Sequence, residues 1–197
     1  MTARIPALEA IENAWVRLEP YDADAHLDGL VAALGHPDVF AGGWGGGAAA
    51  ARTGAELAAW LPTYLPIDSW QVFVVRAPGG RIVGTTTALD LVARTESAHV
   101  GYTAYAPDTW GGEVNPATKL LMLERLFDHG FGRVKLQADV LNTRSRAAIE
   151  RLGAQFEGIA RRDQQRADGS WRDAAVYSIV VDEWPSVRAG LISRLGD

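Results

Sequence analysis

Cysteine is absent from the sequence. The chain therefore has no disulfide, no thiolate metal ligand and no cysteine nucleophile. No apolar run approaches the roughly 20 residues that a bilayer span requires. The first residues, Met1-Thr-Ala-Arg-Ile-Pro, lack the apolar core of a signal peptide. These absences predict a cytoplasmic protein with no membrane partner.

Several common catalytic signatures are missing as well. The sequence contains neither G-x-G-x-x-G nor G-x-x-x-x-G-K-[ST], and it has no G-x-S-x-G elbow. Its four histidines are scattered without H-E-x-x-H spacing, so no metal is expected. The net charge of −5 argues against nucleic acid as a partner, because phosphate backbones bind basic surfaces.

The composition is that of an ordinary globular protein. Apolar residues make up 48% and charged residues 22% of the 197 residues, so a core can form without covalent staples. No linker, repeat or charge block interrupts the chain. We therefore expect one domain that spans residues 1–197.

The most informative segment is Trp110-Gly111-Gly112-Glu113-Val114-Asn115-Pro116. This short glycine-rich turn follows an apolar stretch and opens an amphipathic helix predicted over 115–129. Such a turn leaves several backbone N–H groups unpaired beside a helix N-terminus, where they attract anions. The segment therefore predicts a phosphate site.

The first part of the chain shows alternating and helical periods. Residues 15–19 alternate as a strand, and Asp22 or Asp24 caps a helix that Gly35 ends. The stretch 40–48 is rich in glycine and predicts a flexible loop.

A second helix and a hairpin are predicted next. Thr53-Gly-Ala-Glu56 matches a capping box, and Pro62 should kink or end the helix that it starts. Two strands, 70–76 and 81–90, flank the turn 78–80 and predict a β-hairpin.

The following elements define the fold class. A strand at 98–105, the helix at 115–129 and a strand at 133–140 form a βαβ unit, so the two strands should be parallel neighbours. Asn142 should cap a short helix that Gly153 closes.

The C-terminal part contains two further strands and a last helix. The strands are expected near 156–161 and 174–181, and the helix after Trp184-Pro185. Together the elements predict an α/β protein whose mixed central sheet is partly antiparallel.

Short motifs follow one another in order through the second half of the chain. They are Trp110-Gly111-Gly112, Arg133-Val-Lys-Leu, Asn142-Thr-Arg-Ser145, Arg151-Leu-Gly-Ala, Glu157-Gly158, Arg172-Asp173, Val176-Tyr177-Ser178 and Glu183-Trp184-Pro185. In this series the chain resembles the GNAT N-acetyltransferases, specifically the RimJ/RimL-like branch that acetylates the N-termini of ribosomal proteins. The resemblance runs from about Val16 to the C-terminus.

The resemblance implies a GNAT fold in which two splayed strands bind acetyl-CoA as co-substrate, without a metal. It places the pyrophosphate on backbone N–H groups of the turn 111–117 and the pantetheine arm along the strand edge 101–105. The implied cofactor-binding residues are Tyr102, Thr103, Ala104, Trp110, Gly111, Gly112, Val114, Asn115, Ala117, Asn142 and Arg146.

Two residues are candidates for acid–base chemistry. His99 stands in His99-Val-Gly-Tyr where related enzymes often place a carboxylate base, and a neutral imidazole can accept a proton near pH 7. Alternatively, His99 is a partly buried structural residue. Ser145 follows Asn142 as in the RimL-like N-x-x-S pattern and either donates a hydrogen bond to the leaving thiolate or only supports the helix start. The tyrosine that many GNAT enzymes use is replaced by Ile149.

The phosphate turn departs from the family at Glu113, where a second glycine is usual. A carboxylate beside a pyrophosphate is unfavourable, and a positive φ there would add strain. Lys119, Arg144 and Arg146 either face the phosphates in compensation or are ordinary solvated charges.

The acceptor site is less clearly marked. Trp44 stands alone among glycines and either closes over the acceptor or anchors its loop to the core. The resemblance adds Tyr177 as a substrate-binding residue. It implies an N-acetyltransferase acting on a protein N-terminus or a small amine, and it also suggests a homodimer. The alternative is a CoA-binding GNAT-fold sensor or scaffold that is catalytically weak or inactive.

Overall fold

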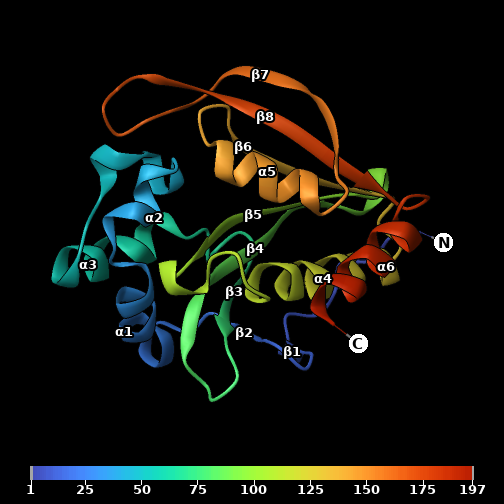
Figure 1. Cartoon of the computed structure of the whole chain (residues 1–197), viewed down its shortest axis with the longest axis horizontal. Coiled ribbons are helices and arrows are strands. Elements are labelled where there is room, and N and C mark those ends of the chain that lie inside the picture. Colours follow the sequence, from blue (N-terminus) through green and yellow to red (C-terminus); the bar gives the residue numbers. More distant parts are fainter. Residues whose placement is uncertain (1, 197) are drawn as a thin grey trace.

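The computed structural model describes residues 2–196, and an eight-stranded mixed sheet forms its centre (Figure 1). The strand order is β1-β2-β3-β4-β5-β6-β8-β7. Only the β5–β6 pair is parallel, and the other neighbours in this sheet are antiparallel. The predicted mixed α/β class is confirmed.

The elements have the following bounds. The strands are β1 (Ile11–Glu12), β2 (Arg17–Pro20), β3 (Gln71–Arg76), β4 (Ile82–Val92), β5 (Ser97–Tyr105), β6 (Arg133–Asp139), β7 (Gln155–Gln165) and β8 (Trp171–Val180). The helices are α1 (Ala23–Leu34), α2 (Pro37–Ala41), α3 (Gly54–Tyr64), α4 (Val114–Asp128), α5 (Thr143–Arg151) and α6 (Trp184–Leu195). Short 3-10 turns are η1 (Trp44–Gly46), η2 (Ala48–Ala50), η3 (Ala93–Thr95) and η4 (Pro107–Thr109).

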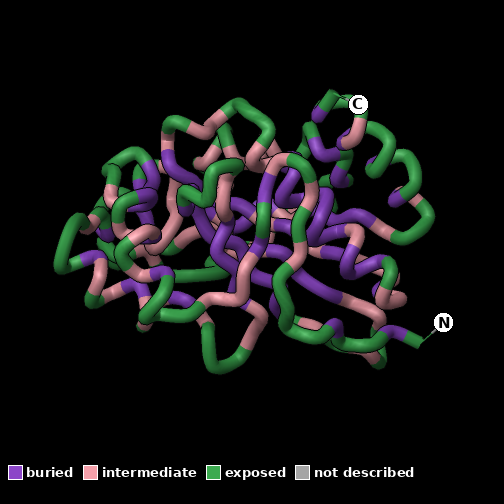
Figure 2. Tube along the Cα trace, turned by 90° about the horizontal axis from the view of Figure 1, so that it is seen from below, coloured by how far each residue is buried: buried purple, intermediate pink, exposed green. Residues whose placement is uncertain are grey.

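Two apolar clusters hold the helices on opposite faces of the sheet. Phe73 and Val75 of β3 belong to the cluster that contains α4, α5 and α6, whereas Val72 and Val74 belong to the cluster of α1, α2 and α3. Successive residues of a strand point to opposite faces. The helices therefore form two layers around the sheet. Buried segments of the chain, purple in Figure 2, run through the middle of the molecule.

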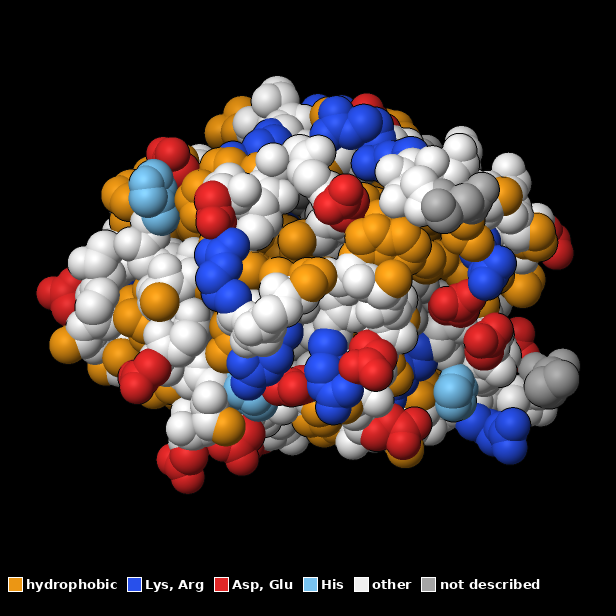
Figure 3. Space-filling view, turned by 60° about the horizontal axis from the view of Figure 1, so that its bottom comes forward, with side chains coloured by type: hydrophobic (Ala, Val, Ile, Leu, Met, Phe, Trp, Pro, Cys, Tyr) orange, Lys and Arg blue, Asp and Glu red, His pale blue; other side chains and the backbone are white. Residues whose placement is uncertain are grey.

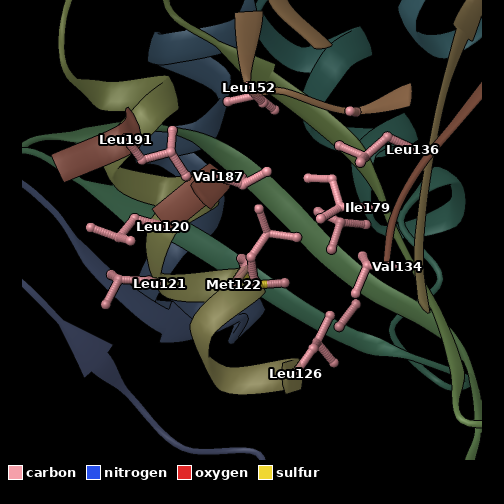
Figure 4. Packing of buried hydrophobic residues seen from close by; sticks show 14 of the residues in the cluster. Leu120, Leu121, Met122, Leu126, Val134, Leu136, Leu152, Ile179, Val187 and Leu191 are labelled. Carbon is pink, nitrogen blue, oxygen red and sulfur yellow. The ribbon is translucent and has the colours of Figure 1, made fainter. Parts of the chain in front are cut away.

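Helix α4 lies deepest in its layer. Its apolar side chains, including Met122 and Leu126, pack towards Val134 of β6 and Ile179 of β8 (Figure 4). Met122 and Leu126 are each 1% exposed, and each such side chain stabilises the fold by roughly 1.5–3 kcal/mol. This packing fixes the start of α4, and with it the glycine-rich turn, relative to the sheet.

The glycine-rich stretch 40–48 is more ordered than the sequence predicts. The prediction of a flexible loop is wrong, because the end of α2 and the turns η1 and η2 occupy this stretch. Gly43 and Gly45 adopt φ of +101° and +66°, which glycine tolerates without strain. Phe40 and Trp44 pack edge to face with ring centroids 5.4 Å apart, which holds the turns together.

Helix capping is confirmed at two of three sites. The side chain of Asp22 accepts the N–H of Ala25, and that of Asn142 accepts the N–H of Ser145. At α3, Thr53 is the N-cap residue but its side chain makes no capping bond, so the capping box is wrong. The helix also continues two residues beyond Pro62.

The predicted βαβ unit is present and its strands splay. β5 and β6 pair only at Ser97, Ala98 and His99, opposite residues 133–135. Beyond this point β5 runs on to Tyr105 and β6 to Asp139 without pairing to one another. A V-shaped opening therefore lies between the two strands on the side where α4 begins.

Within residues 2–196 no helix is both long and apolar enough to cross a membrane. Acidic and basic side chains lie beside one another on the face drawn in Figure 3, and no basic face for phosphate backbones is visible there.

Candidate active site

The turn before α4 presents unpaired backbone N–H groups. Gly111 has a φ of +81°, and a Cβ atom there would meet no atom within 4 Å. Across residues 2–196, no backbone acceptor bonds the N–H groups of Glu113, Val114 or Asn115. They lie at the positive end of the 15-residue helix α4, an arrangement that favours an anion.

Glu113 does not strain this turn. Its φ and ψ are −79° and −20°, which any residue adopts, so the condition for strain, a positive φ, is not met. The carboxylate is exposed and makes no capping hydrogen bond. Only its charge therefore opposes an anion at the turn.

Residues 102–104 form a backbone edge that faces the opening. β6 does not pair with this part of β5, and the β4 pairing is irregular between Thr85 and Thr87. Tyr102 has a φ of +49°, a conformation that non-glycine residues seldom adopt and that clusters at functional sites. An extended ligand with amide groups can pair with such an edge as an added strand does.

Trp110 and Arg144 join the turn to the start of α5. The Arg144 guanidinium lies 3.5 Å from the centroid of the Trp110 ring, and the Trp110 indole N–H donates to the Tyr105 carbonyl over 3.0 Å. The Arg144 guanidinium therefore stacks on the Trp110 ring, so Arg144 is not a free surface charge.

A cavity of about 320 Å³ opens beside this pair. It is lined by Asp38, Ala41, Gly42, Trp110, Leu141, Asn142, Thr143 and Arg144. The turn, the α5 N-terminus and the glycine-rich stretch thus surround one space. Trp110 and Asn142, both predicted from the sequence, meet there.

Ser145 lies in the first turn of α5. Its N–H donates to the Asn142 side chain over 2.9 Å, as the capping prediction requires. The residue is half-buried. The first turn of a helix favours negative charge.

His99 is buried on β5. It is 5% exposed, its Nδ1 lies 3.4 Å from a carboxylate oxygen of Asp90, and its Nε2 has no hydrogen-bond partner in the described structure. Burial, reinforced by the nearby positive charge of Lys135, lowers the pKa of His99 to about 4. A base of this strength is poorly matched to catalysis near pH 7, so the structure favours the buried, structural alternative.

We expect the pH dependence of activity to show no ionisation of His99. Its pKa of about 4 keeps the ring neutral throughout the range from pH 5 to 9. Profiles of kcat/KM against pH for the wild type and for His99→Ala should therefore have the same inflections, even if the maximum value of kcat/KM differs. An inflection near pH 6.5 that disappears in His99→Ala would contradict this expectation.

Three predicted site residues do not face the opening. Ala117 is fully buried and its N–H donates to the Glu113 carbonyl, so its assignment to the cofactor is wrong. Tyr177 is also fully buried; strand alternation turns it towards α5, where its hydroxyl donates to Glu150. In this structure its hydroxyl is therefore engaged with α5. Arg146 donates to the Tyr177 hydroxyl over 3.1 Å and so is directed at β8 instead of a phosphate.

The contacts of Trp44 agree with the second of its two predicted roles, which is to anchor its loop to the core. Its ring packs against Phe40, Trp60 and Tyr64 with centroid distances of 5.4, 5.7 and 5.1 Å. The indole Nε1 is buried without a hydrogen-bond partner within the described structure. Tyr64 also lies 5.2 Å from the Tyr102 ring, so this aromatic group borders the bulge of β5.

Two contacts of buried charged residues were not predicted from the sequence. Lys119 is 5% exposed and donates to the Thr103 hydroxyl over 2.8 Å, so the alternative of a solvated surface charge is wrong for it. Asp139, at the end of β6, forms a buried bidentate ion pair with Arg166 of the β7–β8 loop. Both residue types are common on surfaces, so the sequence offers no signal for either contact.

A CoA thioester is a ligand that fits both parts of this site. The free N–H groups suit its pyrophosphate and the free β5 edge suits its amide-bearing arm. No group of three or more possible metal ligands occurs in residues 2–196.

Comparison with known proteins identifies the family. A family model described as an acetyltransferase (GNAT) domain matches residues 16–155. The chain belongs to this acetyltransferase family, whose members use acetyl-CoA. No curated protein matches the chain.

Solved structures agree with the family. A GCN5-related N-acetyltransferase from Brucella melitensis is 26% identical, with a TM-score of 0.88 over 100% of this chain and 90% of that one. A crystal structure provisionally described as that of an acetyltransferase is 30% identical, with a TM-score of 0.86 over 98% of this chain and 96% of that one. RimJ from Mycobacterium smegmatis, solved with CoA-disulfide, is 21% identical with a TM-score of 0.70 over 90% and 88%, and shows the fold alone.

Proposed function

We propose that the protein is an acetyl-CoA-dependent N-acetyltransferase that acts on a primary amine. The observation that carries this proposal is the set of free N–H groups at Glu113, Val114 and Asn115 beside the unpaired edge of β5. The family's use of acetyl-CoA explains why both features occur together.

In this proposal the two strands and the turn hold the thioester. The N–H groups of 113–115 bind the pyrophosphate, with Trp110, Gly111 and Gly112 shaping the turn. The backbone of 102–104 pairs with the pantetheine arm, and an N–H at the bulge polarises the thioester carbonyl. Asn142 borders the same cavity and contacts the arm.

The reaction forms an amide and breaks a thioester. The amine nitrogen bonds to the acetyl carbon, the carbon–sulfur bond breaks, and the sulfur leaves with the bonding electron pair. The nitrogen loses a proton to solvent and the sulfur regains one. Ser145 donates a hydrogen bond to the sulfur as its charge develops.

For the acceptor we infer a protein N-terminus, as in the RimJ/RimL-like branch, with a small amine as the alternative. The motif series from Trp110 to Pro185 supports this branch. Mass spectrometry of reactions with N-terminal peptides and with small amines tests it. Acetylation confined to peptide α-amines supports the branch, and acetylation confined to small amines contradicts it. A cytoplasmic location and a homodimer stay predictions.

One observation favours a second function, that of a CoA-binding sensor or scaffold. His99, which occupies the usual position of the carboxylate base, is buried and neutral near pH 7. A protein of this kind would bind acetyl-CoA and release no thiol in the presence of any amine.

A further inference from the structure

Lys119 is a buried lysine without a carboxylate partner. It lies on α4 and is 5% exposed. Its Nζ donates to the Thr103 hydroxyl, and it forms no ion pair with any residue that the structure describes. Burial of an ammonium group without a counter-charge is costly, so the free protein holds this amine in an unfavourable environment.

The amine lies at the bulge of β5. The Thr103 hydroxyl that accepts from Lys119 also contacts the Thr86 hydroxyl at 2.9 Å and donates to the Gly101 carbonyl over 3.3 Å. These contacts surround Tyr102, whose positive φ turns the strand at this point. The Thr103 side chain therefore connects the Lys119 amine to the backbone edge of residues 102–104, which faces the opening.

No neighbouring charged group balances a positive charge on Lys119 among the residues that the structure describes. On β5, His99 is neutral above pH 5, and the positive charge of Lys119 itself contributes to the low pKa of His99. Lys135 of β6 adds a further positive charge near His99, and Asp90 of β4 is directed at His99 and Lys135. Burial lowers the pKa of Lys119 to about 7, so most of the amine is neutral at pH 8.

We propose that Lys119 is a positioning residue that becomes charged when acetyl-CoA binds, so that its ammonium group stabilises the negatively charged ligand through Thr103 and the β5 bulge. The inference rests on the proposed function, because it requires acetyl-CoA in the opening. The phosphates of the ligand supply the negative charge that the buried amine lacks, and protonation of Lys119 accompanies binding. The neutral amine of the free protein avoids the cost of a buried charge until the ligand arrives.

Calorimetry at pH 8 in buffers of different ionisation enthalpy tests this, because it counts the protons taken up with acetyl-CoA. For the wild type we expect an uptake approaching about 0.9 proton per ligand, because an amine with a pKa of about 7 is about nine-tenths neutral at pH 8 and becomes charged in the complex. Lys119→Met should abolish the uptake and weaken binding roughly 10-fold. Lys135→Met, which removes a less buried lysine near the same strand, should leave the uptake unchanged.

The outcomes separate the two proposals. No binding of acetyl-CoA to the wild type overturns the proposed function. Binding without proton uptake, or with the same uptake in Lys119→Met, overturns the role of Lys119. Thr103→Val keeps the amine and removes the hydroxyl that links it to the β5 bulge, so it should weaken the binding of acetyl-CoA. This variant keeps the proposal testable if Lys119→Met fails to fold, and wild-type affinity in Thr103→Val would contradict the route through Thr103. Loss of uptake in Lys135→Met would assign the proton to that lysine and also contradict the proposal.

Discussion

Gly112→Asp should lower the affinity for acetyl-CoA roughly 50-fold while the protein stays folded. The new carboxylate adds a negative charge beside the pyrophosphate proposed at 113–115, and two like charges about 5 Å apart repel by roughly 2–3 kcal/mol at a partly exposed site. A Cβ at Gly112 meets only the Thr109 carbonyl, at an ordinary contact distance of 3.5 Å. Titration calorimetry at low ionic strength measures the change, and thermal unfolding checks the fold.

Two matched variants make this result specific. Gly112→Ala adds the same Cβ without charge and should change the affinity less than 3-fold. Glu113→Gln removes the carboxylate already present in the turn and should raise the affinity several-fold, an effect that salt reduces. If Gly112→Asp binds as tightly as Gly112→Ala, the phosphate does not lie at this turn.

Arg166→Ala should destabilise the protein by about 3–5 kcal/mol, which lowers the melting temperature roughly 6–20 °C. Arg166 holds both carboxylate oxygens of Asp139 at 2.7–2.9 Å, and the Asp139 side chain is 4% exposed. Without the guanidinium this carboxylate stays buried, with the N–H of Leu141 as a remaining donor. The variant also frees the end of the β7–β8 hairpin from β6.

An exposed ion pair provides the control. Arg188 lies 2.7 Å from Glu124, and their side chains are 48% and 30% exposed. Such pairs contribute about 0–1 kcal/mol, so Arg188→Ala should shift the melting temperature by less than about 4 °C. Equal shifts in the two variants would show that burial adds nothing at Asp139.

Periodicity was sufficient to predict most of the elements that position the site. The apolar positions of α4 and the alternation in β6 predicted the βαβ unit, because both elements pack against one core. Asn142 was predicted as a cap from residue type alone and makes the expected contact with Ser145. The opening between β5 and β6 then follows from parallel strands that diverge.

The sequence was less informative about which side chains face the opening. Tyr177 belongs to the recognised motif series, but alternation along β8 does not reveal which face looks towards the acceptor. Lys119 follows Thr118 on a largely apolar helix, and the chain alone cannot show that Thr103 meets it across the strand. The order in the glycine-rich stretch depends on contacts of Trp44 with the distant residues Trp60 and Tyr64.

Thiol release from acetyl-CoA, measured with and without a panel of peptide and small amines, tests the central claim most directly. We expect release that depends on the acceptor, is retained by Gly112→Ala and falls steeply in Gly112→Asp at low acetyl-CoA. Binding of acetyl-CoA without acceptor-dependent release from any amine would contradict the assignment as an acetyltransferase and favour a CoA-binding sensor.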